Sequence, residues 1–162
     1  MNPTHIHLLI THLPIFGSIL GALVLTYGLW TKSNTTKIAA YYLFIISAIG
    51  AVIAYLSGGA SEETVENITG IAKNMIDQHE DFAVFALVSL IILGIFSIGG
   101  LFLTLKKSAL TRNIAIVILL ISIISFGLVA RTGYLGGQIR HTEINNANVL
   151  NETQGVEETD ED

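Results

Sequence analysis

Residues 82–105 read FAVFALVSLIILGIFSIGGLFLTL, a run of aliphatic, aromatic and small residues without one charged side chain. A helix needs about 20 such residues to cross the hydrocarbon core of a bilayer. Three further segments have the same property, so the chain is expected to cross the membrane four times. The predicted spans are residues 8–30, 38–57, 82–105 and 114–135. This pattern predicts an all-α transmembrane four-helix bundle.

The composition of the whole chain agrees with a membrane location. Of its 162 residues, 51% are hydrophobic and 13% are charged, whereas a soluble domain carries roughly 25% charged residues. The chain has no cysteine, which excludes disulfides, iron–sulfur clusters and the covalent attachment of a c-type haem. We expect one membrane domain over residues 1–144. Residues 145–162 hold six acids and no base, and are predicted to form a disordered tail.

Two short loops, residues 31–37 and 106–113, join the spans into two antiparallel hairpins, and residues 58–81 connect the hairpins. The short loops hold five of the eight Lys and Arg residues and no acid, while all thirteen acids lie on the other side. Because cytoplasmic loops keep the excess of Lys and Arg, both termini are expected to face outward. The predicted location is a bacterial inner membrane, with both termini in the periplasm.

Residues 61–78, within the long connection, have a helical pattern of their own. Apolar residues recur at Val65, Ile68 and Ala72, behind Ser61 as a candidate N-cap. This spacing predicts an amphipathic helix that lies on the outer surface.

The two hairpins share a short sequence similarity. The second span runs into Ser57-Gly58-Gly59, and the fourth ends in Leu135-Gly136-Gly137. If the hairpins are duplicates, they are related by an axis along the membrane normal.

All five histidines fall at the outer ends of the spans. His5, His7 and His12 lie at the start of the first span, His79 lies at the start of the third, and His141 follows the fourth. Histidine near a membrane span is costly unless it has a partner. We therefore expect a functional site drawn from three helices, with His5, nearest the terminus, as a bystander.

The helical phase of these residues is partly defined. Pro14 disturbs the helix around it, so the sequence leaves open whether His7 and His12 share a face. On the fourth span, a polar stripe is predicted to face the bundle interior at its outer end. Its members are Gly127, Arg131, Tyr134, Gln138 and His141. On the third span, His79 is followed by the small residues Ala83, Ala86 and Ser97, which leave room for a neighbour or a planar group.

Haem b uses this combination of side chains, since two imidazoles bind its iron and polar residues at the aqueous edge bind its propionates. One or two haems fit the residue count. The expected ligands are His7, His12, His79 and His141, with Arg131, Arg140, Tyr134 and Gln138 around the propionates. The alternatives are a copper or zinc site built from the same imidazoles, and half-solvated histidines that bind no cofactor.

The same residues also resemble a known family. His7-Leu-Leu-Ile-Thr-His12-Leu-Pro14, His79 and Gly136-Gly137-Gln-Ile-Arg-His141 are similar to the motifs of a bacterial family of small membrane proteins, the domain of unknown function two-two-three-one. Leu8 and Leu13 depart from the family pattern, which has proline and an aromatic residue there. The resemblance implies a four-span bundle in which His7, His12, His79 and His141 form one functional set, and it fits haem binding.

The expected function is electron transfer by a membrane-bound b-type cytochrome, with haem near the periplasmic side. Its expected partners are membrane lipid, quinol or a respiratory partner subunit, in an oligomer or larger complex, and no nucleic acid. No nucleophile, general-base constellation or nucleotide loop is visible, so an electron-transfer protein is favoured over a stand-alone enzyme. The rivals are a periplasm-facing copper or zinc protein and a cofactor-free structural subunit of a respiratory assembly.

Overall fold

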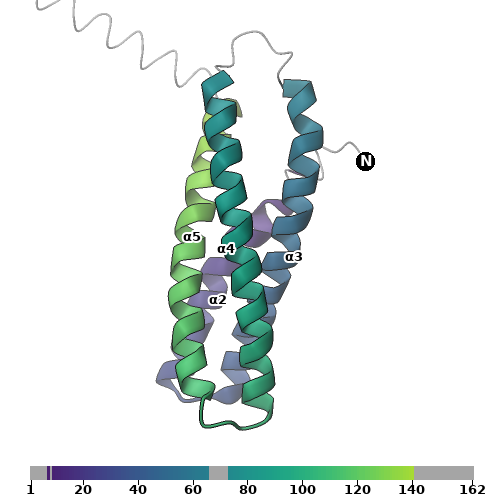
Figure 1. Ribbon diagram of the computed structural model, residues 1–162. Coiled ribbons are helices and arrows are strands. Elements are labelled where there is room, and N and C mark those ends of the chain that lie inside the picture. Colours follow the sequence, from purple (N-terminus) through teal and green to yellow (C-terminus); the bar gives the residue numbers. More distant parts are fainter. Residues whose placement is uncertain (1–6, 8, 66–72, 141–162) are drawn as a thin grey trace, which may run out of the picture.

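Four helices make up nearly all of the chain that the structure, a computed structural model, describes, namely residues 7, 9–65 and 73–140. They are α2 (His12–Trp30), α3 (Asn34–Val65), α4 (Lys73–Leu105) and α5 (Thr111–Arg140) (Figure 1). Helix α2 packs against α3 and α5, and α4 packs against the same two helices. The predicted all-α bundle of two antiparallel hairpins is confirmed.

Each helix is long and apolar enough to cross a membrane. These spans are His12–Trp30, Asn34–Gly58, Asp77–Leu105 and Thr111–Gln138. Lipid offers no hydrogen-bond partner to the backbone, so a span must satisfy its own N–H and C=O groups as a helix. Three of the four run past their predicted limits, because each residue added to an existing helix gains a hydrogen bond at little cost.

The first span begins later than predicted. Residues 7, 9 and 10 are helical, but Thr11 forms a turn, and α2 starts at His12. Pro14 explains this start, because it lies in the first turn of α2, where its missing N–H has no partner to lose.

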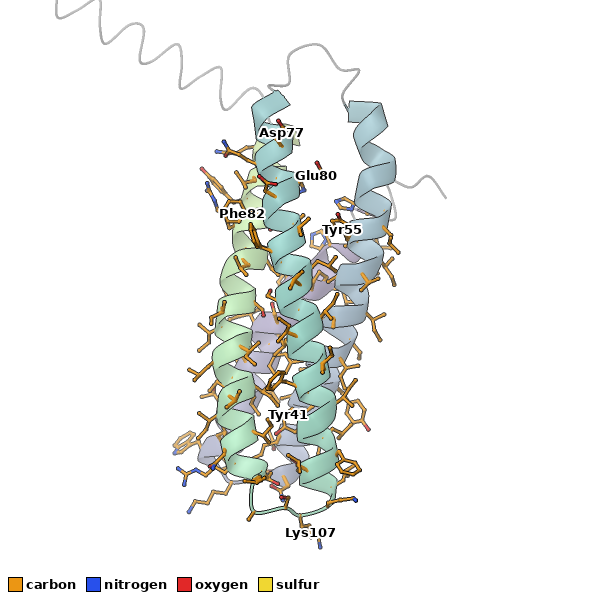
Figure 2. The ribbon with its side chains drawn as sticks, viewed as in Figure 1. Tyr41, Tyr55, Asp77, Glu80, Phe82 and Lys107 are labelled. Carbon is orange, nitrogen blue, oxygen red and sulfur yellow. The ribbon has the colours of Figure 1, made fainter. Side chains whose placement is uncertain are left out.

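The bundle is apolar both inside and outside. Leu25, Phe44, Leu93 and Ile118 are completely buried in the core. Large apolar side chains also cover the outer surface (Figure 2), and Trp30 is 81% exposed. A water-soluble bundle would carry polar groups there, so the outer surface is suited to lipid.

The two short turns lie at the same end of the bundle (Figure 1) and have the same construction. Lys32 and Lys107 both adopt a left-handed backbone, with φ of 56° and 53°. A serine follows each, and its Oγ accepts a backbone N–H two or three residues later. Thr36 in α3 donates to Ser33 (3.2 Å), and Leu110, just before α5, donates to Ser108 (3.3 Å). The five basic residues of the two predicted loops are therefore gathered at one end. They are Lys32, Lys37, Lys106, Lys107 and Arg112.

The described ends of the predicted surface helix, residues 61–78, belong to longer helices. Helix α3 continues through Ser61 to Val65, and α4 already begins at Lys73. Ser61 is thus inside a helix rather than an N-cap, because α3 runs through Gly58 without a break. Residues 66–72, and the predicted tail 145–162, lie outside the described residues.

Close packing of α2 against α3 depends on glycine. A Cβ added at Gly21 would lie 2.5 Å from Cε1 of Phe44, whereas one added at Gly99 on α4 would meet nothing within 4 Å. We expect Gly21→Ala to destabilise the detergent-solubilised protein by about 1–3 kcal/mol through overpacking. Gly99→Ala should leave stability unchanged or raise it by up to about 1 kcal/mol, because alanine is the better helix former. Thermal unfolding followed by circular dichroism measures both. Equal midpoints would contradict this packing.

Candidate functional site

His7 lies against the end of α3 opposite the basic turns. Its Nδ1 is 2.8 Å from the carbonyl oxygen of Ala54. The ring also lies over Gly58, where an added Cβ would be 3.1 Å from Cε1 of the imidazole. His7 is half-buried, so the glycine lets the imidazole rest directly on the helix backbone.

His79 repeats this arrangement in the second hairpin. Its Nδ1 is 3.0 Å from the carbonyl oxygen of Thr132 on α5. An added Cβ at Gly136 would be 3.0 Å from Cε1 of His79. Like His7, His79 is half-buried. In both hairpins an imidazole bonds to one carbonyl of the second helix and covers the glycine four residues later.

This repeated contact explains why a Gly-Gly pair occurs in both hairpins. Gly58 and Gly136 are the positions at which a histidine from elsewhere in the same hairpin contacts the second helix. The shared turn construction at Lys32 and Lys107 points the same way. Together these features support the predicted duplication of a hairpin that carries one histidine.

The hydrogen bonds fix the tautomer of both imidazoles. A backbone carbonyl can only accept, so Nδ1 must carry the proton, and in the neutral ring Nε2 keeps its lone pair. Neither Nε2 has a hydrogen-bond partner in the described part of the chain. Histidines that bind metals commonly have this second-sphere arrangement, with the other ring N–H on a carbonyl.

The two imidazoles lie at the same end of the bundle, away from the short turns. His7 contacts α3 at Ala54, and His79 contacts α5 at Thr132. His7 comes from the chain before α2, and His79 comes from the first turns of α4. The pair therefore brings one imidazole from each hairpin.

His12 faces elsewhere. It is exposed, and its ring stacks on Phe16 at a centroid distance of 6.2 Å and an interplanar angle of 14°. The backbone between the two histidines stays helical, since Thr11 has φ −60° and ψ −25° and its N–H donates to the carbonyl oxygen of His7 at 3.0 Å. Five residues of helix separate His7 from His12 by about 140°, so the two do not share a face. Within residues 7, 9–65 and 73–140, no group of three or more His, Asp or Glu side chains could hold a metal ion.

The polar stripe on α5 does not face the interior, so this prediction is wrong. Arg131 is exposed and Tyr134 is 57% exposed. The Arg131 guanidinium lies 5.6 Å from the centroid of Phe82 and 5.5 Å from that of Tyr134. Gln138 Nε2 donates to the Tyr134 hydroxyl at 2.9 Å. Cation–π contacts and an apolar stem let the arginine remain on the outer surface, while the adjacent face, with Leu135, is buried.

The remaining predicted residues have mixed outcomes. The small face of α4 does point inward, since Ala86 and Ser97 are buried and Ala83 is half-buried. Arg140 is the last residue of α5. His5 and His141 lie outside the described residues, so the part played by His141 stays a prediction, as do the propionate roles of Arg131, Arg140, Tyr134 and Gln138.

Sequence reasoning missed the groups that hold the imidazoles. Ala54 and Thr132 contribute backbone carbonyls, which any residue could supply. Ser57 adds a hydroxyl that donates to the same Ala54 oxygen (3.1 Å) and lies 3.4 Å from His7 Nδ1. The paired glycines were the one signal that could have located these contacts.

Comparison with known proteins adds no relative. No family model, curated protein or solved structure matches the chain. The resemblance to the family of unknown function is carried by the short motifs quoted above.

Proposed function

We propose that this chain is a membrane-bound b-type cytochrome that transfers electrons, with His7 and His79 as the residues that would hold the haem iron. The twin hydrogen bonds from Nδ1 to Ala54 and Thr132 carry this proposal. They place the Nδ1–H of each imidazole on a carbonyl, so that in the neutral ring Nε2 keeps its lone pair, and two such Nε2 atoms are the donor set that a bis-histidine haem requires. A haem held by these two residues would supply a centre for one-electron transfer.

The protein groups would position the ligands before the cofactor binds. Each carbonyl fixes the rotation of its imidazole, and each glycine admits the ring against a helix backbone. A hydrogen bond to a backbone carbonyl also raises the electron density on the ring, which makes Nε2 a better ligand. Because the rings are half-buried, they occupy a partly apolar environment in which haem partitions well.

The proposed site lies toward the periplasm. The two short turns lie at the other end of the bundle (Figure 1). The five basic residues are in or next to these turns, and loops rich in Lys and Arg stay in the cytoplasm. The imidazole pair would then exchange electrons with a donor such as quinol in the outer leaflet, or with a partner subunit of a bacterial inner membrane.

Two ligands fit haem better than they fit a structural zinc or copper site. Such sites usually need three or four protein ligands, and among residues 7, 9–65 and 73–140 no group of three or more His, Asp or Glu side chains could hold a metal ion. One bis-histidine haem is therefore the occupant proposed here.

An optical spectrum tests the proposal directly. Protein purified from haem-replete cells should show a Soret band, and dithionite should sharpen the α and β bands of a low-spin haem. Metal analysis of the same sample should find iron in a one-to-one ratio with haem. A sample without a Soret band that contains copper or zinc would establish the rival metal site, and a sample with neither would refute cofactor binding.

A further inference from the structure

Lys37, near the start of α3, is a lysine whose side chain is largely buried. It is 6% exposed, and its stem lies on α2, where a Cβ added at Gly28 would be 3.2 Å from Cγ of the lysine. Its Nζ donates to Oδ1 of Asn34 at 3.2 Å. Asn34 is exposed and is the first residue of α3. The stem is therefore buried between α2 and α3, while the ammonium is directed toward the end of the bundle that carries the short turns.

The chain offers this ammonium no anion. No Asp or Glu occurs in residues 1–61 or 82–142. The first acid of α3 is Glu62, which lies roughly 40 Å from Lys37 along the helix at 1.5 Å per residue. The Asn34 amide is a neutral acceptor, and a charge that is withdrawn from water is costly unless it is paired. The counter-charge for Lys37 must therefore come from outside the chain.

The place of Lys37 within α3 increases this imbalance. The first turn of a helix is the positive end of its dipole and favours an anion. Helices α3 and α5 have no acid in their first turns and carry Lys37 and Arg112 there instead. Lys106 differs, because it follows the end of α4, where the dipole favours a cation, and its Nζ lies 4.3 Å from the ring centroid of Phe102. An anion beside Lys37 would be favoured by the ammonium and by the helix dipole.

Aromatic side chains mark the membrane surface at this end of the bundle. Tyr27 and Trp30 lie in the last turn of α2 and are exposed, and their rings meet edge to face with centroids 6.2 Å apart. Tyr and Trp are enriched where the lipid headgroups begin. Gly28, between these two residues, contacts Lys37. The ammonium therefore lies near the level of the lipid phosphates.

We propose that Lys37 and Asn34 bind the phosphate group of an anionic phospholipid at this end of the bundle. The ammonium has three N–H donors and uses one on Asn34, which leaves two for phosphate oxygens. Because Oδ1 of Asn34 accepts from the lysine, Nδ2 of the same amide can donate to the phosphate as well. Basic sites between transmembrane helices recognise anionic headgroups in this way. The lipid would supply the negative charge that the chain lacks.

Trp30, the one tryptophan of the chain, provides the measurement, because brominated acyl chains quench indole fluorescence. The full chain is placed in phosphatidylcholine vesicles with a small fraction of brominated phosphatidylglycerol, or with the same fraction of brominated phosphatidylcholine. We expect stronger quenching by the anionic lipid, and high salt should preserve this preference because salt screens partly buried charges less than exposed ones. Equal quenching by the two lipids would overturn the proposal. Release of the anionic lipid by inorganic phosphate at constant ionic strength would also overturn it, in favour of a site for free phosphate.

Lys37→Gln should lower the preference for phosphatidylglycerol by about five-fold, the loss expected for one lysine at an anionic surface. Lys107→Gln is the matched control, since it removes the same charge at the same end of the bundle (Figure 2) from an exposed residue in the turn after α4. In high salt its preference should stay within about two-fold of the unmodified protein. Equal losses in the two variants would show that diffuse surface charge attracts the lipid, and would overturn the site.

Asn34→Asp tests the site without removing the lysine, and an acid in the first turn should also favour α3. Its carboxylate would provide the missing counter-charge and repel the phosphate, so the preference should again fall by about five-fold. Asn113→Asp makes the same change in the first turn of α5 and should retain most of the preference. Full preference in Asn34→Asp would overturn the assignment. The site lies at the opposite end from His7 and His79, so these results do not depend on haem binding.

Discussion

Replacing His79 with alanine is expected to lower the haem content of the purified protein by more than about ten-fold, and His7→Ala should do the same. Each variant removes an Nε2 that has no other partner in the described chain, and loss even of second-sphere groups changes metal affinity by 10- to 100-fold. The imidazole also fills the space over Gly136 or Gly58, so no other side chain takes its place. Absorbance per mole of protein, before and after dithionite, measures the loss.

His12→Ala is the matched control for these two variants. His12 is also a histidine near the start of a span, but it is exposed and stacks on Phe16. Its replacement should leave the spectrum within about two-fold of the unmodified protein, since exposed substitutions rarely disturb a distant site. Loss of haem in His12→Ala with retention in His79→Ala would show that the haem ligands have been assigned to the wrong residues.

The architecture could be predicted from the sequence because lipid imposes a strict rule. Residues 82–105 contain no charged side chain, and such a run has few structures open to it in a membrane other than a helix. The short basic loops then require hairpins. These constraints act on composition and length, which can be read without knowledge of packing.

The orientation of the helices could not be predicted in the same way. Periodicity shows which residues share a face, as Arg131, Tyr134 and Gln138 do, but not which face is inward. In a soluble bundle the apolar face is the buried one. Here both faces of α5 are apolar, since Ile118 is completely buried and Ile124 is 64% exposed. Hydrophobicity therefore cannot show which face of the helix is buried. The aromatic contacts of Arg131 on the outer surface are a tertiary feature.

The candidate site was predicted in part. His7 and His79 were identified from their place at the outer ends of the spans. His12 belongs to a different face because the backbone stays helical through Thr11, and five helical residues rotate a side chain by about 140°. The partners of the imidazoles were not predictable, because they are the backbone carbonyls of Ala54 and Thr132, and every residue has such a carbonyl. The sequence does show one feature of the site, which is the absence of a side chain at Gly58 and Gly136.

That absence leads to the second large effect, which is expected for Gly136→Val. An added Cβ at Gly136 would be 3.0 Å from Cε1 and 3.4 Å from Nδ1 of His79. Valine branches at this atom and has one strongly preferred rotamer in a helix, so it should displace the ring from Thr132. We expect haem affinity to fall by about 10- to 100-fold, as when an outer-sphere partner is removed, with Gly136→Ala in between.

Gly137→Val separates this effect from a general effect on the helix. Gly137 is the next residue of α5, and an added Cβ there would meet nothing within 4 Å. Both valine variants change helix propensity equally, so only the contact with His79 differs between them. Haem titration, with circular dichroism to verify folding, should find Gly137→Val close to the unmodified protein. Equal affinities in the two variants would show that haem binding does not need the contact between the His79 imidazole and Gly136.

If neither protein binds haem, the 15N resonances of the His79 ring still report whether Nδ1 keeps its bonded proton in Gly137→Val and loses it in Gly136→Val.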